Sequence, residues 1–138
     1  MSVYVSGVHI LVDDPEAALV FYRDHLGLTV ENTVNAGGFT WITLVTESQP
    51  ELKIVLEQPH GGRSAENGDA VAGLLAKGEL QMVQFQSADL EGTFEKVSAA
   101  PGAEVLQEPT DQPWGPRDCA LRDPSGNLLR IEQAAAQA

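Results

Sequence analysis

Residues 7–30, GVHILVDDPEAALVFYRDHLGLTV, decide the fold, because they predict a strand, a capped helix and the start of a second strand. Apolar residues first alternate at Val8, Ile10 and Val12, the period-two pattern of a strand with one buried face. Asp14 then occupies the position of an N-cap, before a proline at the first helical position. Gly27 is placed to end that helix in the left-handed conformation. The apolar stripe of the helix consists of Ala18, Phe21, Tyr22 and Leu26.

The formal net charge of the chain is −12, and no cluster of lysine or arginine interrupts the acidic background. Because a polyanion would be repelled, we expect neither nucleic acid nor an anionic membrane as a partner. No apolar run approaches the roughly 20 residues that span a bilayer, and no secretory signal begins the sequence. The single cysteine, Cys119, is interpreted as a small buried residue in a strand, which fits a reducing cytosol. We therefore expect a cytoplasmic protein.

The second half of the chain repeats the first at a constant offset. Adding 75 to the helix cap Asp14 gives Asp89, and adding 75 to the helix end Gly27 gives Gly102. The same offset maps Glu57, near the end of the first half, onto Glu132. This agreement of caps, helix ends and last strands predicts an α+β fold built from two tandem βαβββ modules.

Residues 1–138 are expected to form a single domain of two modules. Module 1 is predicted at 1–58, with strands at 28–36, 39–46 and 52–58 after the opening unit. Residues 59–78 are interpreted as a polar linker followed by a short helix over 69–77. Module 2 is predicted at 79–133, with strands at 80–87, 103–108, 117–123 and 127–133. Residues 134–138 are expected to be a small polar tail.

The two modules are expected to pair their curved mixed sheets into a cup-shaped cleft. Since side chains alternate along a strand, the residues between the apolar ones of each first strand face into that cup. They are Gly7, His9 and Leu11 in module 1 and Met82, Gln84 and Gln86 in module 2. Polar side chains on such a face need a protein partner, a ligand or solvent.

The chain resembles the vicinal oxygen chelate superfamily, the glyoxalase/bleomycin resistance protein/dioxygenase group. Two segments carry the resemblance: residues 12–28, VDDPEAALVFYRDHLGL, and residues 121–132, LRDPSGNLLRIE. The resemblance implies paired βαβββ modules and often a homodimer. It also implies a divalent metal that many members hold in the cup.

In metal-dependent members the ligands come from the first and last strand of each module. The family register places them here at Gly7, Val55, Met82 and Arg130. None of these side chains is a ligand for Zn²⁺, Ni²⁺ or Fe²⁺. The departure argues against a conventional metal site and against a conventional glyoxalase or extradiol dioxygenase activity.

Two residues further along the same strands, the set His9, Glu57, Gln84 and Glu132 offers one imidazole, two carboxylates and an amide. Because a two-residue step keeps a side chain on the same face, this displaced set also faces the cup. The parallel first and last strands of each module are expected to keep His9 beside Glu57. The same arrangement is expected to keep Gln84 beside Glu132.

Three functions follow from these residues, and whether the protein is an enzyme stays open. The favoured one is a binding protein, resembling the bleomycin-resistance branch, that holds a small, partly apolar organic ligand without a metal. Its expected ligand contacts are His9, Trp41, Glu57, Gln84, Trp114 and Arg130. The alternative is a metal-dependent lyase, isomerase or dioxygenase that uses the displaced set. The third is metal-free acid–base catalysis by Glu57 and Glu132, with His9 as a further candidate.

Two of these residues carry alternatives of their own. His9 is either a polar wall residue bonded to Glu57, a ligand contact or a metal ligand. Arg130 either holds an anionic group or forms an ion pair with Glu57 or Glu132. Trp114, in a loop between prolines, offers an amphipathic ring to a flat ligand, whereas Trp41 lies in the middle of a strand.

Overall fold

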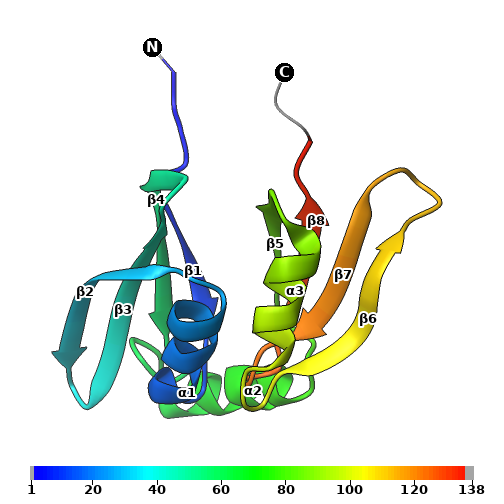
Figure 1. The fold of residues 1–138 in the computed structure, drawn as a ribbon. Coiled ribbons are helices and arrows are strands. Elements are labelled where there is room, and N and C mark those ends of the chain that lie inside the picture. The colour runs from blue at the N-terminus through cyan, green and yellow to red at the C-terminus, as the bar shows by residue number, and fades with distance from the viewer. Residues whose placement is uncertain (1, 136–138) are drawn as a thin grey trace.

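Two four-stranded mixed sheets, one from each half of the chain, organise the molecule (Figure 1). The structure is a computed structural model that describes residues 2–135, so residue 1 and residues 136–138 of the expected tail lie outside the described residues. The first sheet has the order β1-β4-β3-β2 and contains β1 (Gly7–Leu11), β2 (Thr29–Ala36), β3 (Phe39–Thr46) and β4 (Gln49–Glu57). The second has the order β5-β8-β7-β6 and contains β5 (Met82–Ser87), β6 (Glu104–Asp111), β7 (Arg117–Arg122) and β8 (Leu128–Gln133).

The pairing within each sheet confirms the two tandem βαβββ modules. The first strand of each module runs parallel to the last one, as β1 does to β4 and β5 to β8. The other neighbours are antiparallel. Two strands are longer than the sequence predicted. β4 begins at Gln49 because Gln49 pairs with Thr46 across a short turn. β6 runs on to Asp111, and a shift of register between Gln107 and Thr110 accommodates the intervening proline.

The helix of the first module is regular only in its first turns. α1 (Pro15–Leu19) begins after Asp14, as predicted. The Asp14 carboxylate accepts hydrogen bonds from the backbone amides of Glu16 and Ala17. Residues Val20–His25 then form a π-helix, labelled η1. Its wider turn, in which the Leu26 amide donates to the Phe21 carbonyl at 2.9 Å, places the consecutive residues Phe21 and Tyr22 both in the core. The predicted N-cap is therefore confirmed, but the single regular helix is not.

A second helix, α2 (Ala65–Ala76), connects the modules and begins earlier than the predicted 69–77. The difference has a local cause, because the Ser64 hydroxyl accepts a hydrogen bond from the Asn67 amide and caps the helix there. Along the chain α2 separates the two sheets, and it lies across one end of the molecule in Figure 1. Within residues 2–135, no helix has both the length and the apolar character that crossing a membrane requires.

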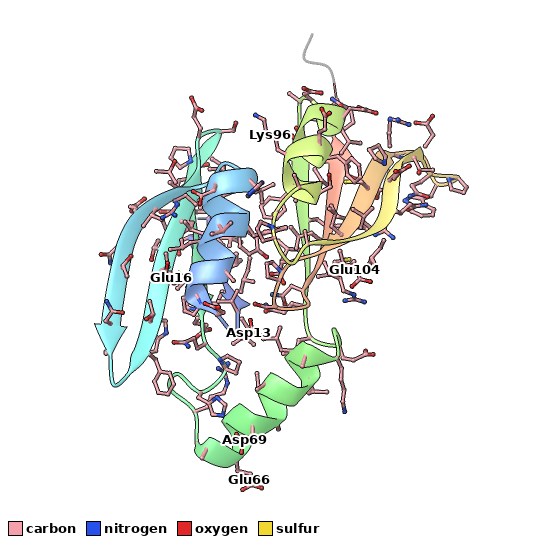
Figure 2. The ribbon with its side chains drawn as sticks, turned by 60° about the horizontal axis from the view of Figure 1, so that its bottom comes forward. Asp13, Glu16, Glu66, Asp69, Lys96 and Glu104 are labelled. Atoms are coloured by element: carbon pink, nitrogen blue, oxygen red, sulfur yellow. The ribbon has the colours of Figure 1, made fainter. Side chains whose placement is uncertain are left out.

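The two modules share one hydrophobic core. α1 and α3 (Leu90–Ser98) lie side by side between the sheets, as Figures 1 and 2 show, and η1 contacts α3. Alternate residues of β1 and of the central strands point to these helices and are fully buried: Ile10, Ile42, Leu44, Leu56, Leu121, Leu129 and Ile131. The residues that alternate with them lie on the opposite face of each sheet, where His9, Glu57, Gln84 and Arg130 lie. Within the chain, the space between the sheets therefore holds the helices and not the expected cup.

Side chains of module 2 join the edge of β1, a boundary that we call the seam. Gln81 bonds to the backbone of His9 and Leu11, Asn127 donates to the Leu11 carbonyl, and the Asp13 amide donates to Ser125. Figure 2 shows Asp13 at the end of α1, where its carboxylate accepts a hydrogen bond from the Ser125 hydroxyl at 2.8 Å. Over residues 2–135 the modules thus meet through side chains, and no backbone ladder joins their sheets.

A buried polar cluster continues the seam into the core. The Tyr22 hydroxyl from η1 donates to the Asp123 carboxylate at 2.6 Å. Asp123 also accepts hydrogen bonds from three backbone amides of its own turn and from the Asn127 side chain. Burial, more than the neighbouring carboxylate, raises the pKa of Tyr22 well above its ordinary value. Tyr22 therefore stays protonated and links the first module to the β7–β8 turn of the second.

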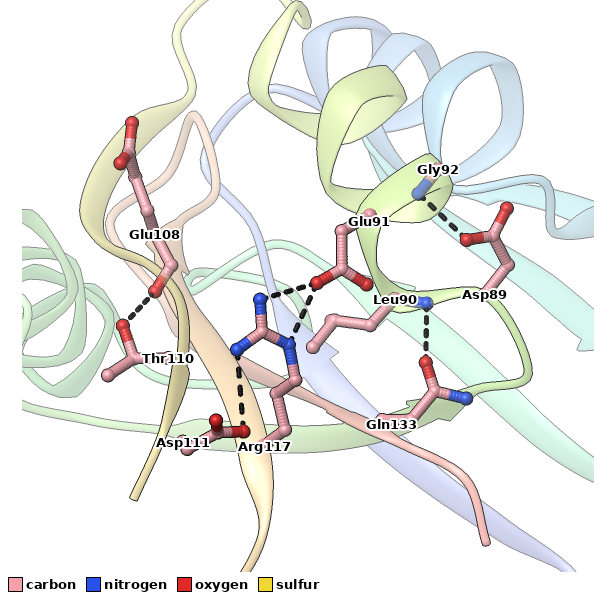
Figure 3. Close-up of polar contacts among 9 residues, drawn as sticks. All are labelled: Asp89, Leu90, Glu91, Gly92, Glu108, Thr110, Asp111, Arg117 and Gln133. Carbon is pink, nitrogen blue, oxygen red and sulfur yellow. Dashed lines mark hydrogen bonds and ion pairs between the residues drawn. The ribbon is translucent and has the colours of Figure 1, made fainter. Parts of the chain in front are cut away.

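Polar contacts also attach α3 to the second sheet (Figure 3). Arg117, at the start of β7, pairs with Glu91 on α3 at 2.6 Å and with Asp111 at 3.4 Å. The Gln133 side chain accepts a hydrogen bond from the Leu90 amide at the first turn of α3. These contacts hold the helix of module 2 against its own sheet.

Candidate functional site

The structure brings His9 and Glu57 together, as the sequence predicted. His9 lies on β1, directly opposite Val55 of the parallel strand β4. Glu57 lies two residues further along β4, on the same face of the sheet. His9 Nδ1 is 3.1 Å from Glu57 Oε1. Glu57 is largely covered, with 16% of its side chain exposed, whereas 55% of the His9 side chain is exposed. The carboxylate therefore orients the ring, and within residues 2–135 the other ring nitrogen, Nε2, has no hydrogen-bond partner.

Trp41 lies next to this pair, but its ring is partly covered by the chain itself. It is the cross-strand partner of Glu57 on β3. The linker after β4 folds back so that a Cβ atom at Gly61 would lie 3.0 Å from Trp41 Cζ2. The linker thus occupies part of the surface that the ring would offer to a ligand.

On the second sheet, Arg130 forms an ion pair with Asp118, which was not among the expected partners. Its Nη1 lies 3.1 Å from the Asp118 carboxylate, which is 97% buried and also accepts a hydrogen bond from Gln112 at 2.7 Å. The prediction that Arg130 forms its ion pair with Glu57 or Glu132 is therefore wrong. The register of the β7–β8 hairpin could have indicated this ion pair. It places Asp118 opposite Glu132, two residues along the ladder from the position opposite Arg130.

The expected contact between Gln84 and Glu132 is also replaced. In the parallel β5–β8 pair, Gln84 lies opposite Arg130 and Gln86 lies opposite Glu132. Gln86 donates to the Glu132 carboxylate at 2.9 Å, so it takes the place predicted for Gln84. A glutamine directly across the ladder reaches the carboxylate more easily than one that must span a pleat.

Two adjoining hollows lie between the modules, and we call them together the groove. The first, of about 330 Å³, separates β1 from β5 and is lined by both His9 and Gln84, with mostly apolar walls that include Val8, Ile54 and Phe85. The second, of about 630 Å³, is lined by Gln84, Gln86, Glu132 and the β3–β4 turn. The two share four lining residues: Thr46, Gln49, Gln84 and Phe85.

The groove therefore collects only some of the expected ligand contacts. His9 and Gln84 line it directly, and Glu57 supports His9. Trp41, Arg130 and Trp114 are not part of its lining. Trp114 lies in the β6–β7 loop and has two thirds of its surface exposed.

The residues at the positions implied for a metal do not fit one. Gly7 has no donor, Val55 is apolar, and the guanidinium of Arg130 is a cation. The displaced set is divided between the sheets, with His9 and Glu57 on one and Gln84 and Glu132 on the other. In the part of the chain that the structure describes, no three side chains of histidine, cysteine, aspartate or glutamate gather as metal ligands.

Cys119 lies on β7 with its side chain fully buried against the core, as the sequence predicted. Burial raises the pKa of its thiol to about 11. At neutral pH it is therefore a protonated packing residue, and it takes no part in the site.

Comparisons with known proteins agree with this architecture. A family model described as Glyoxalase/Bleomycin resistance protein/Dioxygenase superfamily matches residues 4–131. The chain is 30% identical over 125 residues to the uncharacterized protein YurT of Bacillus subtilis (strain 168), a match that covers 90% of this chain and 94% of YurT.

Solved structures with the same fold include two with nearly complete overlap. UcmS2 superposes with a TM-score of 0.82 at 29% identity, covering 96% of this chain and 98% of UcmS2. TnmS3, described as an antibiotic binding protein from Streptomyces sp. CB03234, superposes with a TM-score of 0.72 at 19% identity, covering 97% and 98% of the two chains. The second is a likeness of fold.

Proposed function

Because the chain belongs to the Glyoxalase/Bleomycin resistance protein/Dioxygenase superfamily, we propose that it binds a small, partly apolar organic molecule in its groove. One observation supports this most strongly: the hollow of about 330 Å³ is lined by apolar residues together with His9 of the first module and Gln84 of the second. A concave apolar surface with a few convergent polar groups is typical of small-molecule sites. The description of TnmS3 as an antibiotic binding protein supports the same class of ligand.

Binding in the groove requires no bond to be made or broken. The apolar walls remove a flat or aliphatic part of the ligand from water. The imidazole of His9, oriented by Glu57, and the carboxamide of Gln84 provide hydrogen-bonding groups that fix polar atoms on either side. Arg130 and Trp114 lie on the second module outside this hollow and would contact only a ligand large enough to extend beyond it.

A homodimer in the cytoplasm is part of the proposal. The outer strands β2 and β6 are largely exposed and carry apolar side chains, among them Val34, Val105 and Leu106. A second copy of the chain would cover such a surface. Light scattering coupled to size exclusion should give twice the chain mass of 14.7 kDa, and a single-chain mass at all concentrations would contradict the dimer.

Isothermal titration calorimetry tests the binding function, because neither tryptophan lines the groove to report on it. We expect saturable heat on titration with at least one of two probes, bleomycin and 8-anilinonaphthalene-1-sulfonate. The His9→Ala variant should bind the same probe about tenfold more weakly, since it loses one hydrogen bond. His60→Ala, a histidine outside the groove, is the matched control. Equal affinity of the two variants would place the site elsewhere.

Acid–base catalysis, the third function considered from the sequence, becomes the second candidate because the His9–Glu57 contact of 3.1 Å favours it. A carboxylate that orients an imidazole is a common arrangement for a general base. Such an enzyme would lose turnover in both His9→Ala and Glu57→Gln. Elemental analysis of protein purified without chelator tests the metal-dependent alternative: one equivalent of Zn, Ni or Fe per chain, lost in His9→Ala, would contradict metal-free binding.

A further inference from the structure

We propose that Gln81, the residue before β5, is a positioning residue that fixes His9 in the groove. The Gln81 side chain donates from Nε2 to the His9 carbonyl at 2.9 Å, and its Oε1 accepts from the Leu11 amide at 2.8 Å. It therefore holds the backbone on both sides of Ile10. The inference rests on the proposed function, because it concerns a residue of the same groove.

The two hydrogen bonds imitate a neighbouring strand. In a parallel ladder, one residue donates its amide to residue i−1 of the next strand and accepts from residue i+1. The carboxamide of Gln81 makes the same pair of bonds to residues 9 and 11. β1 is the edge strand of its sheet, so one side chain does what a whole strand would otherwise do at this point.

The ladder on the other side of β1 shows why this edge depends on side chains. The Val12 amide donates to β4, and the Ser6 carbonyl accepts from β4. Since the peptide groups alternate along a strand, those of the odd-numbered residues point to the free edge. Asn127 and Ser125 serve that edge at Leu11 and Asp13, and Gln81 is the residue that reaches His9.

Gln81 also sets the distance across the groove. Its own carbonyl accepts a hydrogen bond from the Leu128 amide, which anchors it to the second sheet. Gln84 follows three residues later on β5. The hydrogen bonds of the Gln81 side chain therefore connect the strand of His9 to the sheet that carries Gln84. Gln81 itself also lines the hollow of about 330 Å³.

Two substitutions separate positioning from general stability. Gln81→Met keeps a similar volume and removes both hydrogen bonds. Gln81→Glu keeps the acceptor for Leu11 but replaces the donor to His9 with a carboxylate oxygen. The matched control is Gln133→Met, because the Gln133 side chain also bonds to backbone groups, at Leu90 and Ala88, but in module 2 at the start of α3 (Figure 3).

The test combines NMR of the ligand-free chain with probe binding. We expect both Gln81 variants to shift the imidazole signals of His9 and leave those of His60 in place. Faster exchange of the Leu11 amide is expected in Gln81→Met only. The affinity for bleomycin or 8-anilinonaphthalene-1-sulfonate should fall about tenfold in both Gln81 variants and stay unchanged in Gln133→Met.

The outcomes are distinguishable. Unchanged His9 signals in both Gln81 variants would overturn the positioning role, whatever the probes do. Shifted His9 signals together with a wild-type chain that binds neither probe would support the positioning role and contradict the proposed function. Equal loss of affinity in Gln133→Met would also overturn the positioning role, because it would reduce the effect to lost stability.

Discussion

Tyr22 is the residue whose single polar atom connects the two modules through the core. Replacing it by phenylalanine leaves the buried Asp123 carboxylate with one donor fewer. We expect Tyr22→Phe to lower the free energy of unfolding by about 1–3 kcal/mol, because the bond is buried and its acceptor is charged. Urea denaturation measures this change. Tyr4→Phe, at an exposed tyrosine, is the control and should change stability little.

The raised pKa of Tyr22 gives a pH dependence with a definite sign. Below pH 10 the tyrosine is protonated in both the folded and the unfolded chain, so its contribution to stability is complete. Above pH 10 the unfolded chain ionises while the folded chain does not, so the free energy of unfolding falls as the pH rises. Denaturation between pH 9 and 11 should show a smaller fall for Tyr22→Phe than for the wild type.

Cys119 should react only when the protein opens. Its thiol is fully buried and its pKa is about 11, so almost no accessible thiolate exists near neutrality. We expect negligible labelling by iodoacetamide at about pH 8 and rapid labelling in denaturing urea. Rapid labelling of the folded chain would contradict the described packing of β7.

Sequence reasoning at the residue level succeeded where the strand period alone decides a neighbour. It placed His9 beside Glu57 and buried Cys119. It failed at Glu132, because Gln86 lies directly opposite this carboxylate and bonds to it, whereas the residue opposite Glu57 is the apolar Leu11. It also missed Asp118, which the register of the β7–β8 hairpin could have indicated. It missed Gln81 because no local pattern identifies a side chain that bonds across the seam.

Replacement by alanine should change the stability of the protein in opposite directions at two glycines of α2. Gly73 faces open space, so Gly73→Ala should stabilise the protein by about 1 kcal/mol through higher helix propensity. At Gly68 the His60 ring lies against the backbone where a Cβ atom would go, so Gly68→Ala should be destabilising. Thermal denaturation of both variants checks this, and equal shifts of the midpoint would contradict the packing of the linker on α2.

The elements themselves were largely predictable, and their irregularities were not. Alternation and caps located all eight strands and the helix after Asp14. The π-helix η1 was not predictable, because its wider turn is stabilised by the burial of Phe21 and Tyr22 in the shared core and by the Tyr22 bond to Asp123 of module 2. The earlier start of α2 was readable in principle, since Ser64 is a good N-cap residue, but the polar composition of 59–68 suggested a linker.

The whole molecule carries a formal net charge of −12, which should make its stability depend on salt. Like charges repel most strongly in the compact state, and salt screens that repulsion. We expect the midpoint of thermal unfolding to rise when sodium chloride is increased from about 10 to 300 mM. A fall over this range would mean that the ion pairs, such as Arg117 with Glu91, outweigh the repulsion.

The duplication predicted the architecture of the whole chain but not how its halves meet. The offset of 75 residues relates equivalent elements of the two modules. It says nothing about the seam, because the seam pairs non-equivalent residues, such as Leu11 of module 1 with Asn127 of module 2. The groove lies along that same seam. Strand alternation therefore indicated some of its lining, such as His9 and Gln84, but not the residues that the seam brings there, such as Gln81.

A joint made of side chains has an evolutionary consequence. Each sheet makes the ladder between its own strands, and module 2 contributes side chains only at the free edge of β1, so most of either copy of the ancestral unit can change its sequence without breaking the ladder of the other. A few point substitutions at the joint are then enough to tilt the halves and reshape the space between them. Duplicated genes with such a joint can acquire new ligand preferences by drift on one side while the other side preserves the fold.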